Sequence, residues 1–382
     1  MALDPEVLDQ LLDTVRDFVT TRLRPLEAKV AEEDAIPEDV HQEMRELGLY
    51  GLSIPEEYGG LELTMEEECL VAIELGRTSP AFRSAFGTNV GIGSQGVVMF
   101  GTEEQKERWL PGIASGELVT SFALSEPDAG SDAGAVQTRA VRDGDEYVLN
   151  GVKRFITNAD RAQLFTVMAR TDPAVQGARG VSAFVVERDS PGLSVGAPEK
   201  KMGQQGTHVC DVFFDDVRVP AENRLGEEGQ GFKLAMTVLD RGRLHISAIC
   251  VGAAERLIAD SVAYASERKQ FDRPIFDFQL VQGMLADMKT EAMAARALVL
   301  ETARKRDAGR NVTLEAAASK YYASEMVGRV ADHAVQIFGG AGYVADYGIE
   351  RFYRDVRIFR LYEGTSQIQQ VVIARELKKR GE

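Results

Sequence analysis

Apolar residues recur at helical spacing in the first and last parts of the chain, whereas the middle consists of short alternating runs. Near the N-terminus, one apolar stripe predicts an amphipathic helix: Leu8, Leu11, Val15, Phe18 and Val19. Asp4 followed by Pro5 is typical of a helix start, because Asp caps the first turn and Pro fits within it. The segment Thr102–Gln105 has the pattern of a capping box and predicts a further helix, which carries Trp109.

The pattern changes twice along the chain. From about Val119 to Pro220, runs rich in Val, Phe and Thr alternate with Asp-Gly, Asn-Gly and Pro-Gly turns, which predicts a β domain. From Gly231 onward, four long helical patterns return; they end near Lys269, Asp307, Phe338 and Lys379. We therefore predict an α+β protein with an all-α domain over residues 1–118, a barrel-like or sandwich β domain over 119–225, and a four-helix bundle over 226–382.

Composition narrows the class of protein. The 382 residues carry a formal charge of −16, which argues against a nucleic-acid partner. Cys69, Cys210 and Cys250 are too few and too far apart for a disulfide framework, and the four histidines are not clustered, so we expect no metal site. The N-terminus lacks the apolar segment of a leader. The uncharged stretch 84–102 contains five glycines, which make it a poor membrane span. We expect a cytoplasmic protein without a membrane span.

One glycine-rich segment imitates a dinucleotide-binding motif. Gly91-Ile-Gly93-Ser-Gln-Gly96 fits G-x-G-x-x-G, but that motif binds a nucleotide only between a strand and a helix. Here it lies within the helical N-terminal part, so we interpret these glycines as helix-packing positions.

Two segments of the β domain are candidates for ligand binding. The segment Ser125–Asp132 follows a strand and contains a proline, a glycine and two hydroxyls, so its backbone N–H groups either bind an anion or form a plain surface turn. The segment Phe155–Asn158 ends another strand with an aromatic and a short polar side chain, which is also typical of an ordinary strand end.

A third candidate lies near the C-terminus, where Glu363 and Gly364 precede a predicted helix start at Thr365 or Ser366. Gly364 allows close approach of a ligand to the backbone. Glu363 is either a surface residue that stabilises the helix dipole or a base whose basicity rises when a ligand excludes water. The sequence leaves both interpretations open.

Taken together and in this order, six segments resemble the acyl-CoA dehydrogenase family over essentially the whole chain: FALSEPDAGSD, RFITN, DRGR, ERKQF, QIFGGAGY and YEGTSQIQ. The resemblance implies FAD as cofactor, acyl-CoA as substrate, an electron-transfer flavoprotein as electron acceptor and a homotetramer. It also implies that Glu363 is the catalytic base. Some members carry this base on a helix, at the position that matches Gly242 here. Glycine has no side chain that could act as a base, so Glu363 has no rival.

The resemblance also assigns binding residues. Ser125 would bind the flavin pyrimidine edge, and Ser131 would lie near the diphosphate or CoA. The FAD-binding residues that the resemblance implies are Phe122, Ala123, Leu124, Ser125, Ser131, Phe155, Ile156, Thr157, Arg268, Phe271, Gln279, Gln336, Ile337, Gly339, Gly340, Thr365 and Gln367, those from Arg268 to Gly340 across a subunit boundary. The substrate-binding residues are Ser131, Asp240, Arg243 and Gly364.

Two further residues have alternative interpretations. Arg83 matches an arginine with which glutaryl-type members bind a distal carboxylate, but the SQIQ sequence departs from that subgroup and favours a structural arginine. His245 either borders the acyl pocket or packs in the core, and we favour the core.

Three other functions remain as alternatives on the same fold: an acyl-CoA oxidase, a flavin monooxygenase and a non-catalytic flavoprotein that acts as an assembly partner. Glu363 and Arg243 favour the dehydrogenase, and a short or branched acyl-CoA is the expected substrate.

Overall fold

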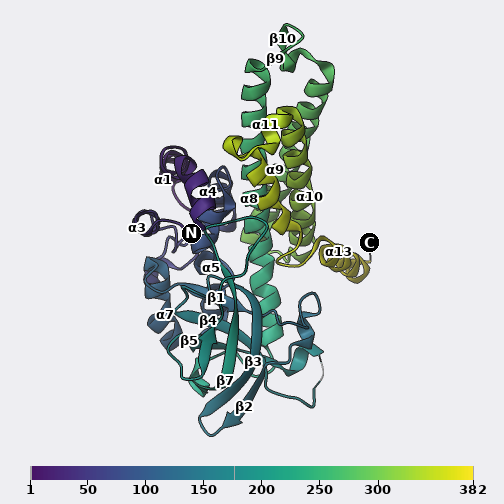
Figure 1. The fold of residues 1–382 in the computed structure, drawn as a ribbon. Helices are drawn as coiled ribbons and strands as arrows, with labels where there is room; N and C mark the ends of the chain where they lie inside the picture. The colour runs from purple at the N-terminus through teal and green to yellow at the C-terminus, as the bar shows by residue number, and fades with distance from the viewer. Residues whose placement is uncertain (1, 176, 382) are drawn as a thin grey trace.

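The computed structural model describes residues 2–175 and 177–381 (Figure 1). Its elements follow the predicted order, with helices first, then a sheet, then long helices. The N-terminal helices are α1 (Pro5–Asp17), α2 (Glu27–Glu33), α3 (Glu38–Glu46), α4 (Met65–Leu75), α5 (Pro80–Val90), α6 (Gln95–Phe100) and α7 (Glu103–Ser115). The predicted helix starts are confirmed, because Asp4 caps α1 and Thr102 forms a capping box with Gln105. After α1 the chain continues as a π-helical turn, Phe18–Leu23.

The middle of the chain forms one mixed sheet. Its strands are β1 (Thr120–Ala123), β2 (Arg139–Asp143), β3 (Glu146–Thr157), β4 (Leu164–Arg170), β5 (Val181–Glu187), β6 (Leu193–Val195), β7 (Val209–Pro220) and β8 (Arg224–Leu225). They pair in the order β6-β7-β3-β2-β4-β5-β8, and β1 pairs in parallel with β4. Because β6 and β8 do not pair with each other in the described part of the chain, the sheet is open and is not a closed barrel.

The two faces of the sheet belong to different cores. Along β4, Leu164 and Met168 pack into a core shared with α7 and with the first turns of α8 (Gly231–Glu267). Phe165 and Val167 point the other way, into a core enclosed mainly by the strands. The sheet therefore packs directly against the start of the longest helix.

The C-terminal part is a bundle built around α8, which has 37 residues and is about 55 Å long at 1.5 Å per residue. The other elements are β9 (Lys269–Gln270), β10 (Arg273–Pro274), α9 (Gln279–Asp307), α10 (Thr313–Phe338), α11 (Gly340–Tyr343), α12 (Ile349–Asp355) and α13 (Ser366–Arg380). Helices α8, α9 and α10 pack against one another, and α13 packs against α10. Figure 1 shows that α8 runs from the sheet at one end to the β9–β10 hairpin at the other.

The helices and the metal-binding side chains of the described residues bear on the expected lack of a membrane span and of a metal site. None of their helices is both long enough and apolar enough to cross a membrane. No group of three or more His, Cys, Asp or Glu side chains in residues 2–175 and 177–381 is arranged to hold a metal ion.

Candidate active site

The loop before α13 has an unusual backbone. Thr365 caps α13, because its hydroxyl oxygen accepts the backbone N–H of Ile368 at 3.2 Å. Glu363 and Gly364 precede this cap with φ values of +52° and +89°, in the left-handed region. A residue other than glycine costs about 1–3 kcal/mol in such a conformation and persists only where its surroundings hold it. The strained residue here is the predicted base.

The Glu363 carboxylate lies over a glycine of α8. A Cβ atom placed on Gly242 would come within 2.5 Å of Glu363 Oε2, so only glycine leaves room for the carboxylate in this position. Oε2 is buried and has no hydrogen-bond partner among the described residues. A buried polar atom without a partner is uncommon and points to a group that acts on a ligand.

Burial and nearby cations act on the Glu363 carboxyl in opposite directions. Loss of water raises its pKa, while Arg83, Lys320 and Arg243 each lower it. The net direction is upward, so the carboxylate is a stronger base than an exposed glutamate. This is the arrangement that proton abstraction from a weak carbon acid needs.

Asp240 and Arg243 flank Gly242 on α8. Arg243 Nη1 donates to Asp240 Oδ1 at 2.5 Å, and the Thr313 hydroxyl at the start of α10 donates to Asp240 Oδ2 at 2.9 Å. Arg243 is buried, and its Nε lacks a hydrogen-bond partner in the described part of the chain. The pair is therefore held in place and retains a free donor.

The turn after β1 is held from below by a buried ion pair. Lys153 is fully buried on β3, and its Nζ donates to the Leu124 carbonyl at 3.0 Å and to Glu126 Oε1 at 2.7 Å. Glu126 also accepts the backbone N–H groups of Gln137 and Thr138. Ser125, between these anchored residues, is half-buried, and Ser131 is exposed. The Lys153–Glu126 ion pair therefore fixes the buried side of the turn and leaves its exposed side open to a ligand.

Strand β3 brings Phe155 next to this turn. The backbone N–H of Arg154 donates to the Ser125 carbonyl at 2.8 Å, and the Ser121 hydroxyl donates to the Thr157 carbonyl at 2.7 Å. Phe155 has a φ of +59° and remains 59% exposed. An aromatic ring held in water by a strained backbone is a platform for a planar ligand.

The remaining predicted residues lie at the opposite end of the bundle. Arg268 follows the last turn of α8, and Tyr264, one turn earlier, stacks on Phe338 at the end of α10. Phe271 and Gln279 belong to the β9–β10 hairpin and the start of α9, and Gln336, Ile337, Gly339 and Gly340 surround the α10–α11 junction. About 45 Å of helix separates Arg268 from Val238, which packs in one core with Phe122 and Leu124, just before the Ser125 turn. One protomer does not bring the two groups together.

Three family models match successive parts of the chain: the acyl-CoA dehydrogenase N-terminal domain at residues 5–117, the middle domain at 121–217 and the C-terminal domain at 229–378. The chain belongs to the acyl-CoA dehydrogenase family. It is 43% identical to the probable acyl-CoA dehydrogenase YngJ of Bacillus subtilis, over 96% of this chain and 97% of the relative. It is 44% identical to the acryloyl-CoA reductase (NADH) of Anaerotignum propionicum, over 97% and 94%.

Two solved structures agree with this assignment. Butyryl-CoA dehydrogenase from Megasphaera elsdenii matches with a TM-score of 0.95 at 37% identity, over 99% of both chains. A chain from structural work on the electron transferring flavoprotein of Acidaminococcus fermentans matches with a TM-score of 0.94 at 40% identity, again over 99% of both. The protein is therefore an oxidoreductase of the acyl-CoA dehydrogenase family, whose members use FAD.

The residues present fit an FAD molecule. Phe155 offers an exposed aromatic face beside Ser125, as described above. Gly130, Gly339 and Gly340 have open space around them, since a Cβ atom at each would meet nothing within 4 Å. The individual binding residues stay predictions.

Arg83 belongs to a buried chain of polar side chains in this acyl-CoA dehydrogenase. Its Nε donates to His245 Nε2 at 2.9 Å, His245 Nδ1 hydrogen-bonds Glu68 Oε1 at 2.7 Å, and Glu68 Oε2 pairs with Arg241. His245 is 2% exposed, and burial followed by the charge of Arg83 lowers its pKa. His245 is thus buried within a hydrogen-bonded network, as favoured from the sequence. Arg83 stays structural in our prediction.

The structure agrees with the interpretation of Gly91, Gly93 and Gly96 as packing positions rather than as a dinucleotide-binding motif. Gly91 and Gly93 lie between α5 and α6, and Gly96 lies within the first turn of α6, away from any strand-to-helix turn. A Cβ atom on Gly93 would come within 2.2 Å of Thr120 Oγ1, so its glycine allows the helical part to approach β1.

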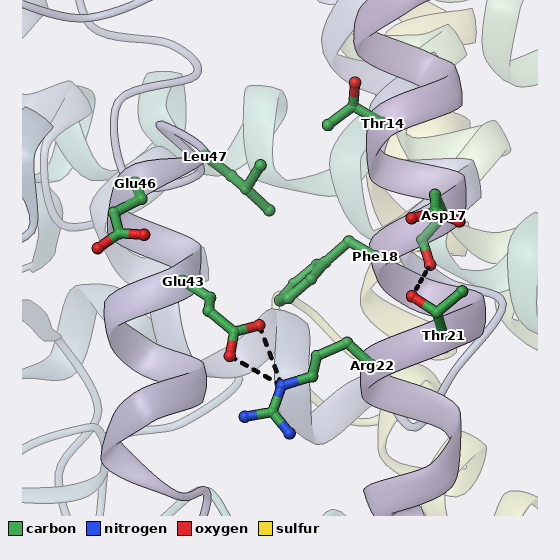
Figure 2. A pocket seen from close by; sticks show the side chains of 8 residues that line it. All are labelled: Thr14, Asp17, Phe18, Thr21, Arg22, Glu43, Glu46 and Leu47. Carbon is green, nitrogen blue, oxygen red and sulfur yellow. Dashed lines mark hydrogen bonds and ion pairs between the residues drawn. The ribbon is translucent and has the colours of Figure 1, made fainter.

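A hollow of about 430 Å³ between α1 and α3 is a second place to consider (Figure 2). Its cationic side chain, Arg22, is already bound to Glu43 and Asp39. None of the predicted site residues lines it. It is therefore separate from the active site.

Sequence reasoning missed three residues that support the site: Lys320, Lys153 and Glu126. The helical spacing contained a signal for Lys320. It stands three or four positions from Ala316, Ala317, Ala323 and Ser324, all buried, so it belongs to the buried face of α10.

Proposed function

We propose that this protein converts an acyl-CoA thioester to the trans-2-enoyl-CoA, with Glu363 removing the α-proton. The observation that carries the proposal is the buried Oε2 of Glu363, which lies above Gly242 and has no hydrogen-bond partner in residues 2–175 and 177–381. The dehydrogenase reaction follows from the family; the residue roles and the substrate are our proposals.

The loop supplies both a base and a donor. The α-proton of a thioester is weakly acidic, so the carbonyl oxygen must be polarised while the proton leaves. The backbone N–H of Glu363 provides a fixed donor for that oxygen, and one preorganised donor is worth about 3–4 kcal/mol. Bound FAD would supply the acceptor for the β-hydrogen, which leaves as hydride. The raised pKa of Glu363 suits the carboxylate for receiving the proton.

Binding of the cofactor and substrate is divided among three groups of residues. We propose that the Ser125 turn and the Phe155 segment contact the flavin, and that Asp240 and Arg243 hold the CoA portion. The group from Arg268 to Gly340 would contact the same FAD from another subunit, because about 45 Å separates the two groups in one chain. Exposed apolar side chains at this end support an interface: Phe271 is 88% exposed, and Leu280 and Tyr343 are each 85% exposed.

We propose a homotetramer that passes electrons to an electron-transfer flavoprotein. We also propose a cytoplasmic location, in keeping with three cysteines that are buried and free of disulfides. Size-exclusion chromatography with light scattering tests the assembly. Reoxidation by a purified electron-transfer flavoprotein under argon tests the acceptor.

The residues described above say least about the acyl group of the substrate. We propose a short or branched acyl chain. A relative named acryloyl-CoA reductase (NADH) favours a second candidate, reduction of a 2-enoyl-CoA at the same site. The direction of the reaction is then set by the electron partner. An oxygen-using oxidase or monooxygenase, or a non-catalytic flavoprotein, remains a weaker alternative, because Glu363 and Arg243 are both present.

The test is anaerobic bleaching of the flavin. The purified protein is expected to be yellow, and a panel of acyl-CoAs mixed without oxygen is expected to bleach it, fastest for the best substrate. Glu363→Gln removes the base at nearly constant volume and is expected to abolish bleaching while FAD remains bound. Bleaching of Glu363→Gln at the wild-type rate would contradict the role of Glu363, and protein that binds no FAD would contradict the cofactor site.

A further inference from the structure

Lys320, on α10, is a buried cation that makes one hydrogen bond within the described part of the chain. Its side chain is fully buried, and its Nζ donates to the Gly364 carbonyl at 2.6 Å. No carboxylate of the described residues lies within 4.0 Å of it. Burial of an ammonium without a paired carboxylate is costly, so folding alone does not explain this lysine.

The carbonyl that Lys320 binds belongs to the loop of the proposed base. Gln369, on the first turn of α13, donates from the same Nε2 to the Gly364 carbonyl and to the Glu363 carbonyl, both at 3.0 Å. Two side chains from two helices therefore fix two successive carbonyl groups. This is the restraint that the left-handed backbone of Glu363 requires.

The orientation of the loop determines where both reactive groups of Glu363 point. With the carbonyls fixed, the Glu363 carboxylate lies over Gly242 and the backbone N–H has one direction. A rotation of the loop would move both groups together. Misplacement of a catalytic group by about 1 Å can lower a rate about a hundredfold.

We propose that Lys320 is a positioning residue for the dehydrogenation: its ammonium clamps the Gly364 carbonyl and, with Gln369, holds Glu363 in its reactive orientation. The proposal rests on the proposed function, because it requires Glu363 to be the base.

The charge of Lys320 gives the clamp a pH dependence. Burial lowers the pKa of Lys320 to about 8, opposed by the Glu363 carboxylate. The other groups acting on it are Cys250 and Arg243 of α8 and Glu325 of α10. The ammonium is present below pH 8 and is lost above it, so the clamp weakens as the pH rises. In the unfolded chain the lysine keeps its proton to a higher pH, so loss of the proton from about pH 8 upward favours the folded state. Activity and stability should therefore respond to this group in opposite directions.

The experiment uses the FAD-loaded protein and follows anaerobic flavin bleaching by butyryl-CoA, or by the best acyl-CoA of the panel, in a stopped-flow instrument. Lys320→Met removes the donor and the charge but keeps much of the volume. We expect its limiting rate to fall about ten- to a hundredfold at pH 7, with less than about a threefold change in the apparent Kd of the acyl-CoA. The decline of the wild-type rate above pH 8 should disappear in Lys320→Met. Lys320→Arg, which keeps a charged donor, should recover part of the rate.

Ser319→Ala is the matched control. Ser319 is the neighbouring buried residue on α10, but its hydroxyl bonds the Glu315 carbonyl and Thr302, away from the loop. We expect its bleaching rate to stay at the wild-type value. FAD content and melting temperature are measured for every variant, so a loss of folding is seen separately from a loss of rate.

If Lys320→Met does not fold, Gln369→Leu tests the same clamp from α13 and is expected to lower the limiting rate. Wild-type rates and an unchanged pH profile in the variant that folds would overturn the proposal. Glu363→Gln separates this result from failure of the proposed function. An inactive Glu363→Gln beside a fully active Lys320→Met rejects only the clamp, whereas an active Glu363→Gln rejects the base itself.

Discussion

Gly242→Ala tests the geometry of the proposed site most directly, because it adds one methyl group beneath the carboxylate. The new Cβ atom would lie 2.5 Å from Glu363 Oε2 and 3.2 Å from its Cδ. Ordinary contact begins at 3.4 Å, so the carboxylate must move by about 1 Å. The backbone is fixed by Lys320 and Gln369, and the side chain therefore rotates away from its position over α8.

The expected result is a slow enzyme that is not destabilised. A displacement of about 1 Å lowers the rate about a hundredfold, which corresponds to about 2.7 kcal/mol in the activation barrier. Stability should change in the other direction, because alanine is more favourable than glycine within a helix by about 0.8–1 kcal/mol. The clash involves only the far end of a flexible side chain, so its relief costs little.

The assay compares anaerobic bleaching rates, FAD content and thermal unfolding of Gly242→Ala with those of Gly328→Ala. Gly328 lies within α10, and a Cβ atom there would meet the Arg360 guanidinium at an ordinary 3.4 Å. Both variants gain helix propensity, but only Gly242→Ala should lose rate. Wild-type bleaching by a folded, FAD-loaded Gly242→Ala would refute the placement of the carboxylate over this residue.

Three further variants test other parts of the molecule. Lys153→Met leaves the Glu126 charge buried without its partner, so urea unfolding should show a loss of about 3–5 kcal/mol, with part of it restored in the Lys153→Met/Glu126→Gln double variant. Phe155→Ala removes the exposed ring beside the Ser125 turn and should raise the Kd for FAD, measured by flavin fluorescence, while the melting temperature of the FAD-free protein stays unchanged. Arg83→Ala, if Arg83 is structural, should lower bleaching by butyryl-CoA and by glutaryl-CoA in the same proportion; a loss confined to glutaryl-CoA would show that Arg83 binds a distal carboxylate.

The helices and their ends were predictable because their signals are local. Asp4 with Pro5, and Thr102 with Gln105, specify helix starts through contacts within a few residues. The start of the last helix at Thr365 or Ser366 was predicted in the same way, and Thr365 proved to be the cap. Such contacts form within one turn and do not depend on the rest of the fold.

The sheet was predictable only in part, since strand order depends on distant pairings. The alternating runs predicted a β domain. They do not indicate that β1 pairs in parallel with β4 or that β7 lies beside β3. Whether such a sheet closes depends on its two edge strands, which are far apart in the sequence.

The candidate site shows the same division between local and distant information. The family resemblance assigned the base to Glu363 and matched Gly242 to the position from which other members supply it, and the structure places the Glu363 carboxylate beside Gly242. The helical spacing of α10 indicates that Lys320 is buried, but not what it binds, because its partner is a backbone carbonyl 44 positions away. Backbone carbonyls carry no residue-specific signal, so a contact of this kind is found only in three dimensions.

The length of α8 has a consequence for mixtures of defective chains. The helix carries Gly242, beneath the proposed base, in its first third and leads to Arg268 at its far end. If one FAD is held by the loop side of one subunit and the Arg268 side of another, a chain altered at Glu363 and a chain altered at Arg268 are each inactive alone. Co-expressed, they would form mixed assemblies in which some sites contain only intact halves. Two inactive proteins would then complement each other and regain part of the activity.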